Sequence, residues 1–133
     1  WDTAGQEQYK SITRNFYKNS DGVVVVFDVT SKNTFNKVTE WIESVYDNID
    51  KSVNMVLIGN KVDLPREVSS TDAKKLAERY NIKYFETSAK ENIGINESMI
   101  ELISQVVNSK KQKEENDKID ITKPVESSSK CFC

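Results

Sequence analysis

The sequence predicts an α/β fold in which a mostly parallel sheet lies between two layers of helices. Segments 23–29 (VVVVFDV) and 53–58 (VNMVLI) are nearly continuous apolar runs, which is typical of strands buried on both faces of a parallel sheet. A shorter third strand is expected at 83–86 (KYFE). Helical patterns separate these segments, and such alternation indicates right-handed βαβ units.

Each predicted helix shows an apolar stripe with steps of three and four residues. The expected helices cover 34–49, a second segment with Ala73, Leu76, Ala77 and Tyr80, and a third segment from Gly94 to about 107. The Ser69-Ser70-Thr71-Asp72 stretch has the S-x-x-D pattern that caps a helix N-terminus. Residues 8–18 are weakly helical. These stripes predict a packed core rather than a function.

The composition excludes several classes of function. The chain has 133 residues, 19 of them basic and 21 acidic, and its pI is about 5.3, which argues against a nucleic-acid-binding face. Because it contains no histidine, a catalytic triad with histidine and a histidine-ligated metal site are both excluded within this chain. The longest apolar run, 23–27, is far shorter than the roughly 20 residues that span a bilayer.

The composition changes near residue 108, and we predict that residues 108–133 form a disordered tail. Segment 110–130 carries six lysines and five acidic residues, so it is not a strong polybasic patch. The two cysteines, Cys131 and Cys133, lie at the extreme C-terminus, where a single disulfide would constrain almost none of the chain, so we expect no disulfide framework. The chain begins at Trp1 rather than at a methionine, and we expect it to be a fragment of a longer protein.

Three polar motifs carry the chemistry of the sequence. They are 1–7 (WDTAGQE), 59–63 (GNKVD) directly after the second strand, and 86–90 (ETSAK) directly after the third. Ligands of open α/β sheets bind at the carboxyl ends of the strands. We therefore expect the second and third motifs to lie side by side at one edge of the sheet.

The second and third motifs suit recognition of a guanine base. The Asp63 carboxylate can accept hydrogen bonds from the ring N–H and the exocyclic amine of guanine, and adenine offers no such pair of donors. Asn60 is expected to tie the loop to its neighbours, and the Lys61 stem to lie along the base. The Ala89 N–H can donate to a carbonyl of the base, and Lys90 can pack on its other side. The alternative is an ordinary polar loop between strand and helix.

The first motif suits phosphate chemistry. Asp2 can hold a hard cation such as Mg²⁺, usually through water. The Gly5 N–H can approach a terminal phosphate because no side chain obstructs it. Gln6 offers both a donor and an acceptor, as orienting an attacking water requires. The alternative for this motif is a simple turn.

In this order, the three motifs resemble those of the small GTPase superfamily, and the chain is most similar to the Rab family over residues 1 to about 107. Three further stretches resemble Rab signature segments: 8–13 (QYKSIT), 16–20 (FYKNS) and 25–30 (VVFDVT). Gln8, Asn19 and Ser20 depart from the arginine and the Gly-Ala pair that are usual there. These departures leave the subfamily open.

The resemblance implies a three-layer fold of the P-loop NTPase (Ras-like) type and a switch that binds GTP and GDP, hydrolyses GTP and regulates vesicle trafficking. It assigns hydrolysis to Gln6, Mg²⁺ to Asp2 through water, and GTP binding to Gly5, Asn60, Lys61, Asp63, Ser88, Ala89 and Lys90. Segment 6–18 would be the second switch, in which Tyr9, Ile12 and Phe16 either contact effectors or pack against a neighbouring helix. The implied protein partners are effectors, an exchange factor, a GTPase-activating protein and the prenylation machinery.

The end of the chain, Cys131-Phe132-Cys133, resembles the double-prenylation site of Rab proteins. Two lipid chains anchor a protein stably, whereas one chain binds a membrane only marginally. The alternatives are free thiols or half of a metal site, although the chain offers no further cysteine or histidine as a ligand. The resemblance places the complete protein on the cytoplasmic face of intracellular membranes, from which it cycles with the cytosol.

The chain departs from the family in one respect that bears on activity. It contains no G-x-x-x-x-G-K-[ST] phosphate loop, and the first strands and the first switch are missing too, which amounts to roughly 30 residues or more. We therefore expect the chain alone to bind guanine nucleotide weakly and to be inactive in hydrolysis, with segment 23–27 at an exposed sheet edge. The rival interpretation is a truncated, non-catalytic interaction module that keeps only effector-binding surfaces.

Overall fold

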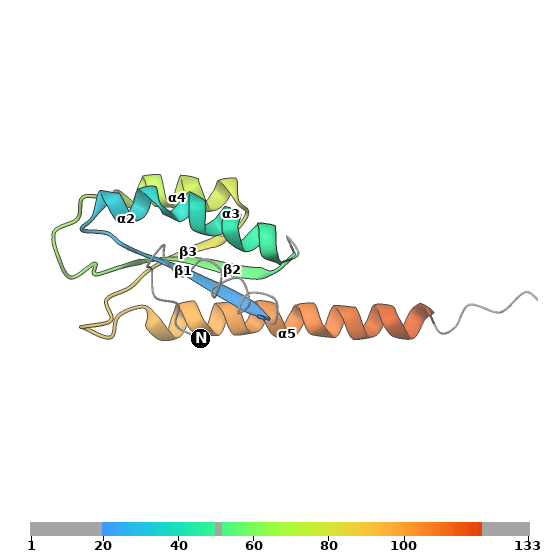
Figure 1. Cartoon of the computed structure of the whole chain (residues 1–133). Helices are drawn as coiled ribbons and strands as arrows, with labels where there is room; N and C mark the ends of the chain where they lie inside the picture. The colour runs from blue at the N-terminus through green and yellow to red at the C-terminus, as the bar shows by residue number, and fades with distance from the viewer. Residues whose placement is uncertain (1–19, 50–51, 121–133) are drawn as a thin grey trace, which may run out of the picture.

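The computed structural model describes residues 20–49 and 52–120, and these form an α/β fold of three layers (Figure 1). Helices α2, α3 and α4 cover one face of the sheet, and α5 covers the other. The elements in chain order are β1 Gly22–Asp28, α2 Lys32–Asn36, α3 Val38–Asn48, β2 Asn54–Asn60, α4 Ser70–Arg79, β3 Lys83–Glu86 and α5 Ile95–Asp120. The predicted fold class is confirmed.

The sheet of the described residues has the strand order β1-β2-β3, and both strand pairs are parallel. Gly22 lies opposite Asn54 and Asp28 opposite Asn60 in the first pair, and Val56 lies opposite Lys83 in the second. Because all strands run in one direction, the loops that follow β1, β2 and β3 leave the same edge of the sheet. That edge carries the predicted site.

The larger core lies between the sheet and helices α2, α3 and α4. Alternate residues of β1, namely Val25 and Phe27, are buried and point to this face, as the period of two in a strand requires. They pack with buried residues of the other elements: Val38, Ile42 and Val45 of α3, Leu57 of β2, and Ala73 and Ala77 of α4. The Phe27 ring lies 5.0 Å from that of Phe35 in α2.

A smaller core joins α5 to the opposite face of the sheet. Val56 and Ile58 of β2 pack there with Leu102 of α5. At Gly22 the helix comes so close that an added Cβ would lie 3.0 Å from a Leu102 methyl carbon. Both faces of β2 are therefore covered, which explains why its sequence is apolar without alternation.

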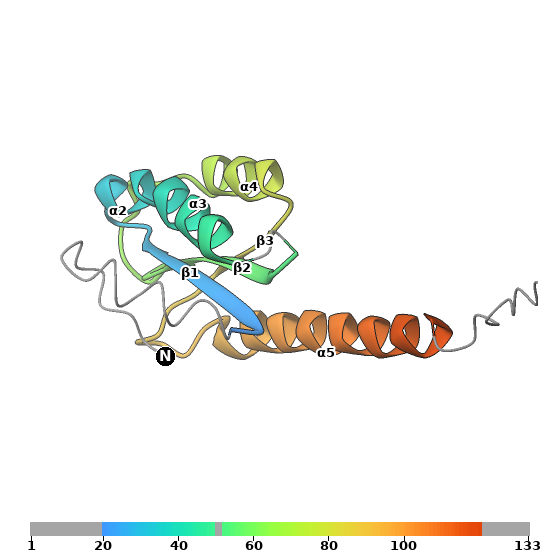
Figure 2. The ribbon, with the colours of Figure 1, turned by 45° about the vertical axis from the view of Figure 1, so that its right-hand side comes forward.

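Two predicted helix boundaries are wrong. The helix expected at 34–49 is divided at Lys37, which ends α2 and precedes α3. The helix expected to end near 107 continues to Asp120 (Figure 2), so the part of the predicted disordered tail from 108 to 120 is helical.

Two kinds of contact account for the longer helix. The Ser109 hydroxyl donates to the Asn54 side chain at 3.0 Å, and Lys110 forms an ion pair of 2.9 Å with Asp21. The following turns consist largely of lysine, glutamine and glutamate, which favour a solvated helix and offer pairs four residues apart. Residues 121–133, with the rest of the predicted tail, lie outside the described residues.

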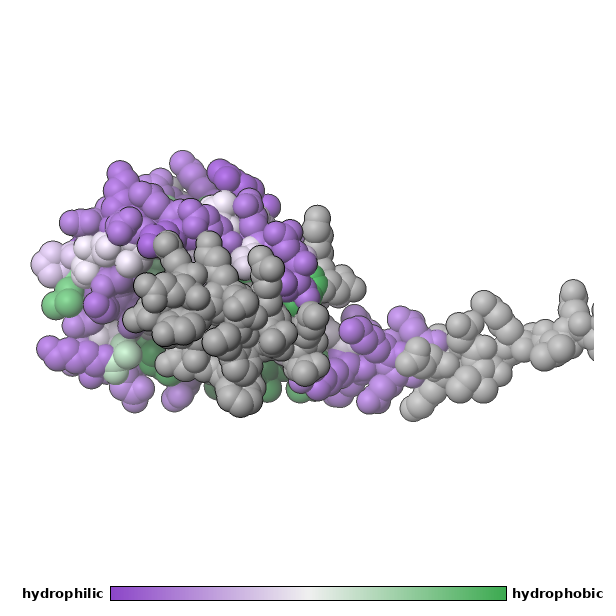
Figure 3. Space-filling model, in the orientation of Figure 1, coloured by the Kyte–Doolittle hydropathy of each residue, from purple (hydrophilic) through white to green (hydrophobic). Residues whose placement is uncertain are grey.

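The described part of the chain leaves apolar surface near one edge. No described strand pairs with the outer edge of β1, where Val26 is exposed. Ile100, Ile103 and Val107 of α5 are exposed as well. In Figure 3 apolar side chains show in the region of α5, while the layer of α2, α3 and α4 above is mostly hydrophilic. Among the described helices, none has the length and apolar character that crossing a membrane requires.

Burial in the smaller core predicts opposite outcomes for two adjacent residues of α5. Leu102 is 8% exposed and Ile103 is 60% exposed. Leu102→Ala should lower the free energy of unfolding by about 2 to 4 kcal/mol, because it removes buried methyl groups and leaves a cavity. Ile103→Ala should change it by no more than about 0.5 kcal/mol. Urea unfolding followed by circular dichroism measures both values, and equal losses would contradict this packing.

Candidate functional site

The candidate site consists of two loops that leave neighbouring strands at the same edge of the sheet. β2 ends at Asn60 and its loop begins with Lys61, and the loop after β3 begins with Thr87. Their main chains pair directly: the Thr87 N–H donates to the Gly59 carbonyl at 2.9 Å, and the Val62 N–H donates to the Thr87 carbonyl at 3.1 Å. The structure therefore brings the second and third predicted motifs together.

Asn60 joins the two loops through its side chain. Its Oδ1 accepts a hydrogen bond from the Ala89 N–H at 3.1 Å and another from the Thr87 hydroxyl at 3.0 Å. Asn60 thus makes the tie expected from the sequence. The Ala89 N–H, which the sequence interpretation directed to a carbonyl of the base, donates to Asn60 in this structure.

Asp63 is held by Ser88. The Ser88 hydroxyl is fully buried and donates to Asp63 Oδ1 at 2.5 Å, while its oxygen accepts from the Glu91 N–H at 3.1 Å. Asp63 itself is an exposed residue. Its carboxylate is therefore fixed through one oxygen at the rim of the site, where a ligand from solvent can reach it.

Each of the two loops also carries a lysine, Lys61 in the first and Lys90 in the second. Lys61 has a φ of 69°, in the left-handed region that lysine seldom adopts, and its ammonium lies 2.5 Å from Asp28 Oδ2 at the end of β1. Lys90 is strongly exposed, and its ammonium lies 4.0 Å from the Glu91 carboxylate.

Asp28 was not singled out by sequence reasoning. Its Oδ1 accepts from the Thr30 N–H at 2.8 Å and from the Thr30 hydroxyl at 2.6 Å. Burial raises the pKa of this carboxyl, but the hydrogen bonds from Lys61 and Thr30 outweigh burial, so the pKa lies below its ordinary value. The available signal was a single acid inside the apolar run of β1, because such an acid needs a partner.

A network around Glu86, directly before the loop after β3, was also missed. Arg66 donates to both carboxylate oxygens of Glu86, at 2.9 and 3.2 Å. Ser70 at the start of α4 and Tyr84 of β3 donate to Oε1 at 2.5 and 3.1 Å. These contacts tie the loop after β2, the start of α4 and the end of β3 together. The hydrogen bonds from Arg66, against the opposing effect of burial, lower the pKa of Glu86 to about 2.

The loop after β3 closes on itself before α5. Ser88 and Ile93 exchange two main-chain hydrogen bonds of 3.0 Å. Gly94 follows with a φ of 68°, and a Cβ added there would collide with the Glu86 carbonyl oxygen. Only glycine fits this position without strain, which explains the glycine at the predicted entry to the third helix.

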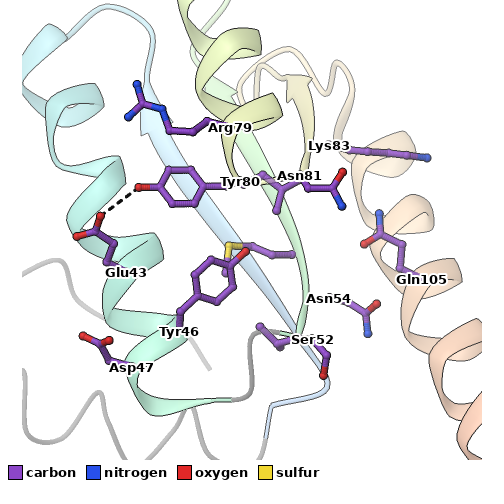
Figure 4. Close-up of a pocket in the computed structure, with 13 residues that line it drawn as sticks. Glu43, Tyr46, Asp47, Ser52, Asn54, Arg79, Tyr80, Asn81, Lys83 and Gln105 are labelled. Carbon is purple, nitrogen blue, oxygen red and sulfur yellow. Dashed lines mark hydrogen bonds between the residues drawn. The ribbon is translucent and has the colours of Figure 1, made fainter.

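A cavity of about 850 Å³ lies at the other end of the sheet, between α3, α4 and the first residues of β2 and β3 (Figure 4). Across it the Tyr80 hydroxyl donates to the Glu43 carboxylate at 3.2 Å. Because the two loops lie at the carboxyl ends of the strands, this cavity is separate from the candidate site. No sequence motif indicated this cavity.

The remaining predicted functional residues lie outside the described residues. They are Asp2, Gly5, Gln6, Tyr9, Ile12, Phe16, Cys131 and Cys133. Within residues 20–49 and 52–120, no group of three or more acidic or cysteine side chains could hold a metal ion. The residue predicted to hold Mg²⁺, Asp2, lies outside these ranges.

Parallel α/β topology, with an N-K-x-D loop and an S-A-K loop joined at one sheet edge, defines a Ras-like α/β protein. The sequence profile of the Ras family matches residues 1–108. The chain therefore belongs to the Ras family, and within it the chain is a Rab-like small GTPase.

Similar proteins support this assignment. The Ras-related protein Rab-8B of Dictyostelium discoideum is 40% identical over 108 residues, which cover 80% of this chain and 53% of the relative. Rab11B of Nicotiana tabacum is 41% identical over 108 residues, covering 80% and 50%. Rab-1C of Dictyostelium discoideum is 43% identical over 115 residues, covering 85% and 57%. The chain spans about half the length of these relatives.

The Glu86 network predicts a pH-dependent contribution to stability. The pKa of Glu86 is about 2 in the folded chain against an ordinary value of 4.5. Its contribution is therefore present above pH 4.5 and is lost as the pH falls from 4.5 towards 2. Glu86→Gln should cost about 1 kcal/mol at pH 7, after allowance for solvent screening of this partly exposed pair, and almost nothing near pH 2.

Urea unfolding at several pH values measures this difference. Glu78→Gln is the matched control, since Glu78 is an exposed acid of α4 for which the described residues provide no side-chain partner. A Glu86→Gln cost that stays constant with pH would show that the charge of Glu86 does not stabilise the fold.

Proposed function

We propose that the complete protein is a switch of the Rab type, which binds GTP and GDP, hydrolyses GTP and regulates vesicle trafficking. The observation that carries the proposal is that two hydrogen bonds, Ser88 to Asp63 and Ala89 N–H to Asn60, join the N-K-x-D and S-A-K loops. Membership of the Ras family supports guanine nucleotide binding in general.

The base is bound, in this proposal, by the edge formed by the two loops. Besides the hydrogen bond from Ser88, the Asp63 carboxylate can accept others, and it accepts one from the ring N–H and one from the exocyclic amine of guanine. The stems of Lys61 and Lys90 cover the two faces of the base. Adenine is rejected because it would offer the carboxylate no N–H group that can donate a hydrogen bond.

Phosphate chemistry is assigned to the first motif. The Gly5 N–H binds the γ-phosphate, Gln6 orients the attacking water, and Asp2 holds Mg²⁺ through water. Bound Mg²⁺ supplies positive charge against the phosphate oxygens. Residues 6–18 serve as a switch segment for effectors, an exchange factor and a GTPase-activating protein.

Membrane attachment is assigned to Cys131 and Cys133. Prenylation of both thiols supplies the two lipid chains that stable anchoring requires. The length of α5, which reaches Asp120, supports a role for the C-terminal segment as a spacer between the domain and the cytoplasmic face of an intracellular membrane. Intact mass of the protein from eukaryotic cells tests for the two isoprenoids.

A second candidate function is a non-catalytic interaction module. The absence of a G-x-x-x-x-G-K-[ST] motif from the sequence favours it for this chain by itself. In that case the chain binds effector proteins through its surface but does not hydrolyse nucleotide.

The specificity of the base site is tested by exchanging the pattern of donors and acceptors. In Asp63→Asn the side chain accepts one hydrogen bond and donates another, which matches xanthine rather than guanine. The variant should bind guanosine monophosphate at least about tenfold more weakly and gain affinity for xanthosine monophosphate. Nuclear magnetic resonance titration at millimolar ligand measures both. Asp72→Asn, the same exchange at an exposed position of α4, should change neither, and unchanged preference in Asp63→Asn would refute the base assignment.

The chain by itself should not bind nucleotide tightly, because it has no backbone cradle or lysine of a phosphate loop. Isothermal titration calorimetry with GTP, in the presence and absence of Mg²⁺, should show no submicromolar binding, and phosphate release should match the rate without protein. Tight, Mg²⁺-dependent binding would contradict this prediction while leaving the base site intact.

A further inference from the structure

We propose that Asp28 is a positioning residue of the base site: it holds the Lys61 ammonium so that the lysine stem already lies in the orientation that stacks on guanine. The inference rests on the proposed function, since it concerns the same site. It adds the carboxyl end of β1 to a site otherwise built from the loops after β2 and β3.

The position of Asp28 follows from strand register. Asp28 is the last residue of β1 and lies opposite Asn60, the last residue of β2, so Lys61 begins its loop beside the Asp28 carboxylate. The contact between Asp28 Oδ2 and Lys61 Nζ is 2.5 Å. The side chain of Asp28 is 19% exposed and that of Lys61 is 52% exposed, so the acid is a sheltered anchor and the lysine stem remains accessible to a ligand.

The anchor itself cannot turn freely. Its other oxygen, Oδ1, accepts from both the N–H and the hydroxyl of Thr30. The backbone of Asp28 is fixed separately, because its N–H and its carbonyl both bond to the Thr34 hydroxyl, at 3.0 and 3.1 Å. The turn after β1 is thus closed by backbone groups and Thr34, and the Asp28 carboxylate is left to hold Thr30 and Lys61.

Lys61 is fixed at both ends. Its backbone has a φ of 69°, and the next residue, Val62, donates to the Thr87 carbonyl. Its ammonium is held by Asp28. A free lysine loses much rotamer freedom when it is ordered by a ligand, and a stem ordered beforehand avoids that loss on binding.

The stability of the fold does not by itself explain the Asp28–Lys61 ion pair. An ion pair whose lysine is as exposed as Lys61 contributes little to stability. Asp21, directly before β1, offers a comparison: it is strongly exposed and pairs with Lys110 of α5 at 2.9 Å. In the described structure Asp21 makes no contact with the two loops.

The test is titration of the 133-residue chain with guanosine monophosphate, followed by nuclear magnetic resonance. Asp28→Asn should weaken binding about three- to tenfold, and Asp21→Asn, the matched control, should leave it unchanged. In the unmodified chain the ring of the base should shift the ε-CH₂ protons of Lys61 upfield, and Asp28→Asn should reduce this shift.

A double-mutant cycle separates positioning from a general structural role. Lys61→Gln should weaken binding as well, and adding Asp28→Asn to Lys61→Gln should cost nothing more. If the two losses multiply instead, Asp28 does not act through Lys61 and the inference is overturned. Should Asp28→Asn fail to fold by circular dichroism, Asp28→Glu in the same cycle gives the answer: it retains a carboxylate, so it should weaken binding less than Lys61→Gln does, and an equal loss overturns the inference.

The outcomes also separate this inference from the proposed function. If Asp63→Asn abolishes guanosine monophosphate binding and Asp28→Asn binds like the unmodified chain, the base site stands and the role of Asp28 is wrong. If the unmodified chain binds guanosine and adenosine monophosphates alike and Asp63→Asn changes nothing, the proposed base site fails, and the role of Asp28 fails with it.

Discussion

The site depends on the parallel pairing of β2 with strands on both of its sides. Pairing with β1 sets Asp28 opposite Asn60, and pairing with β3 sets Gly59 opposite Glu86. If β2 shifted its register by one residue, the Asn60 side chain would move to the other face of the sheet from Asp28. The contacts of Asn60 with Thr87 and Ala89 would then be lost. The packed apolar faces of β2 therefore fix the geometry of its polar loop.

The sequence was sufficient to predict the sheet and the meeting of the two loops, because both follow from local patterns. Continuous apolar runs locate strands buried on both faces, and parallel topology brings their carboxyl ends to one edge. The loops at Asp63 and Ser88 could then be expected to be neighbours. Their roles in binding guanine stay predictions, and so do the roles of Gly5, Gln6 and Asp2.

Other features depend on contacts between distant residues, which no local pattern specifies. Arg66 and Glu86 are twenty residues apart in sequence and meet only because α4 returns the chain to β3. The end of α5 was misplaced for the same reason: polarity suggested disorder after 107, but contacts with Asn54 and Asp21 anchor the helix there. The division at Lys37 falls within one continuous apolar stripe, so the spacing of apolar residues did not indicate it.

The residues proposed for base recognition and those proposed for phosphate chemistry fall in separate segments of this chain. In the described structure the contacts that join the proposed base site, from Asp28–Lys61 to Ser88–Asp63, lie within segment 28–94. The residues assigned to phosphate and Mg²⁺ all fall in segment 1–7. A rigid base edge gives specificity, because an ordered carboxylate discriminates between purines without rearranging. It gives little affinity alone, since one base offers few contacts, so tight binding has to come from the phosphates and whatever holds them.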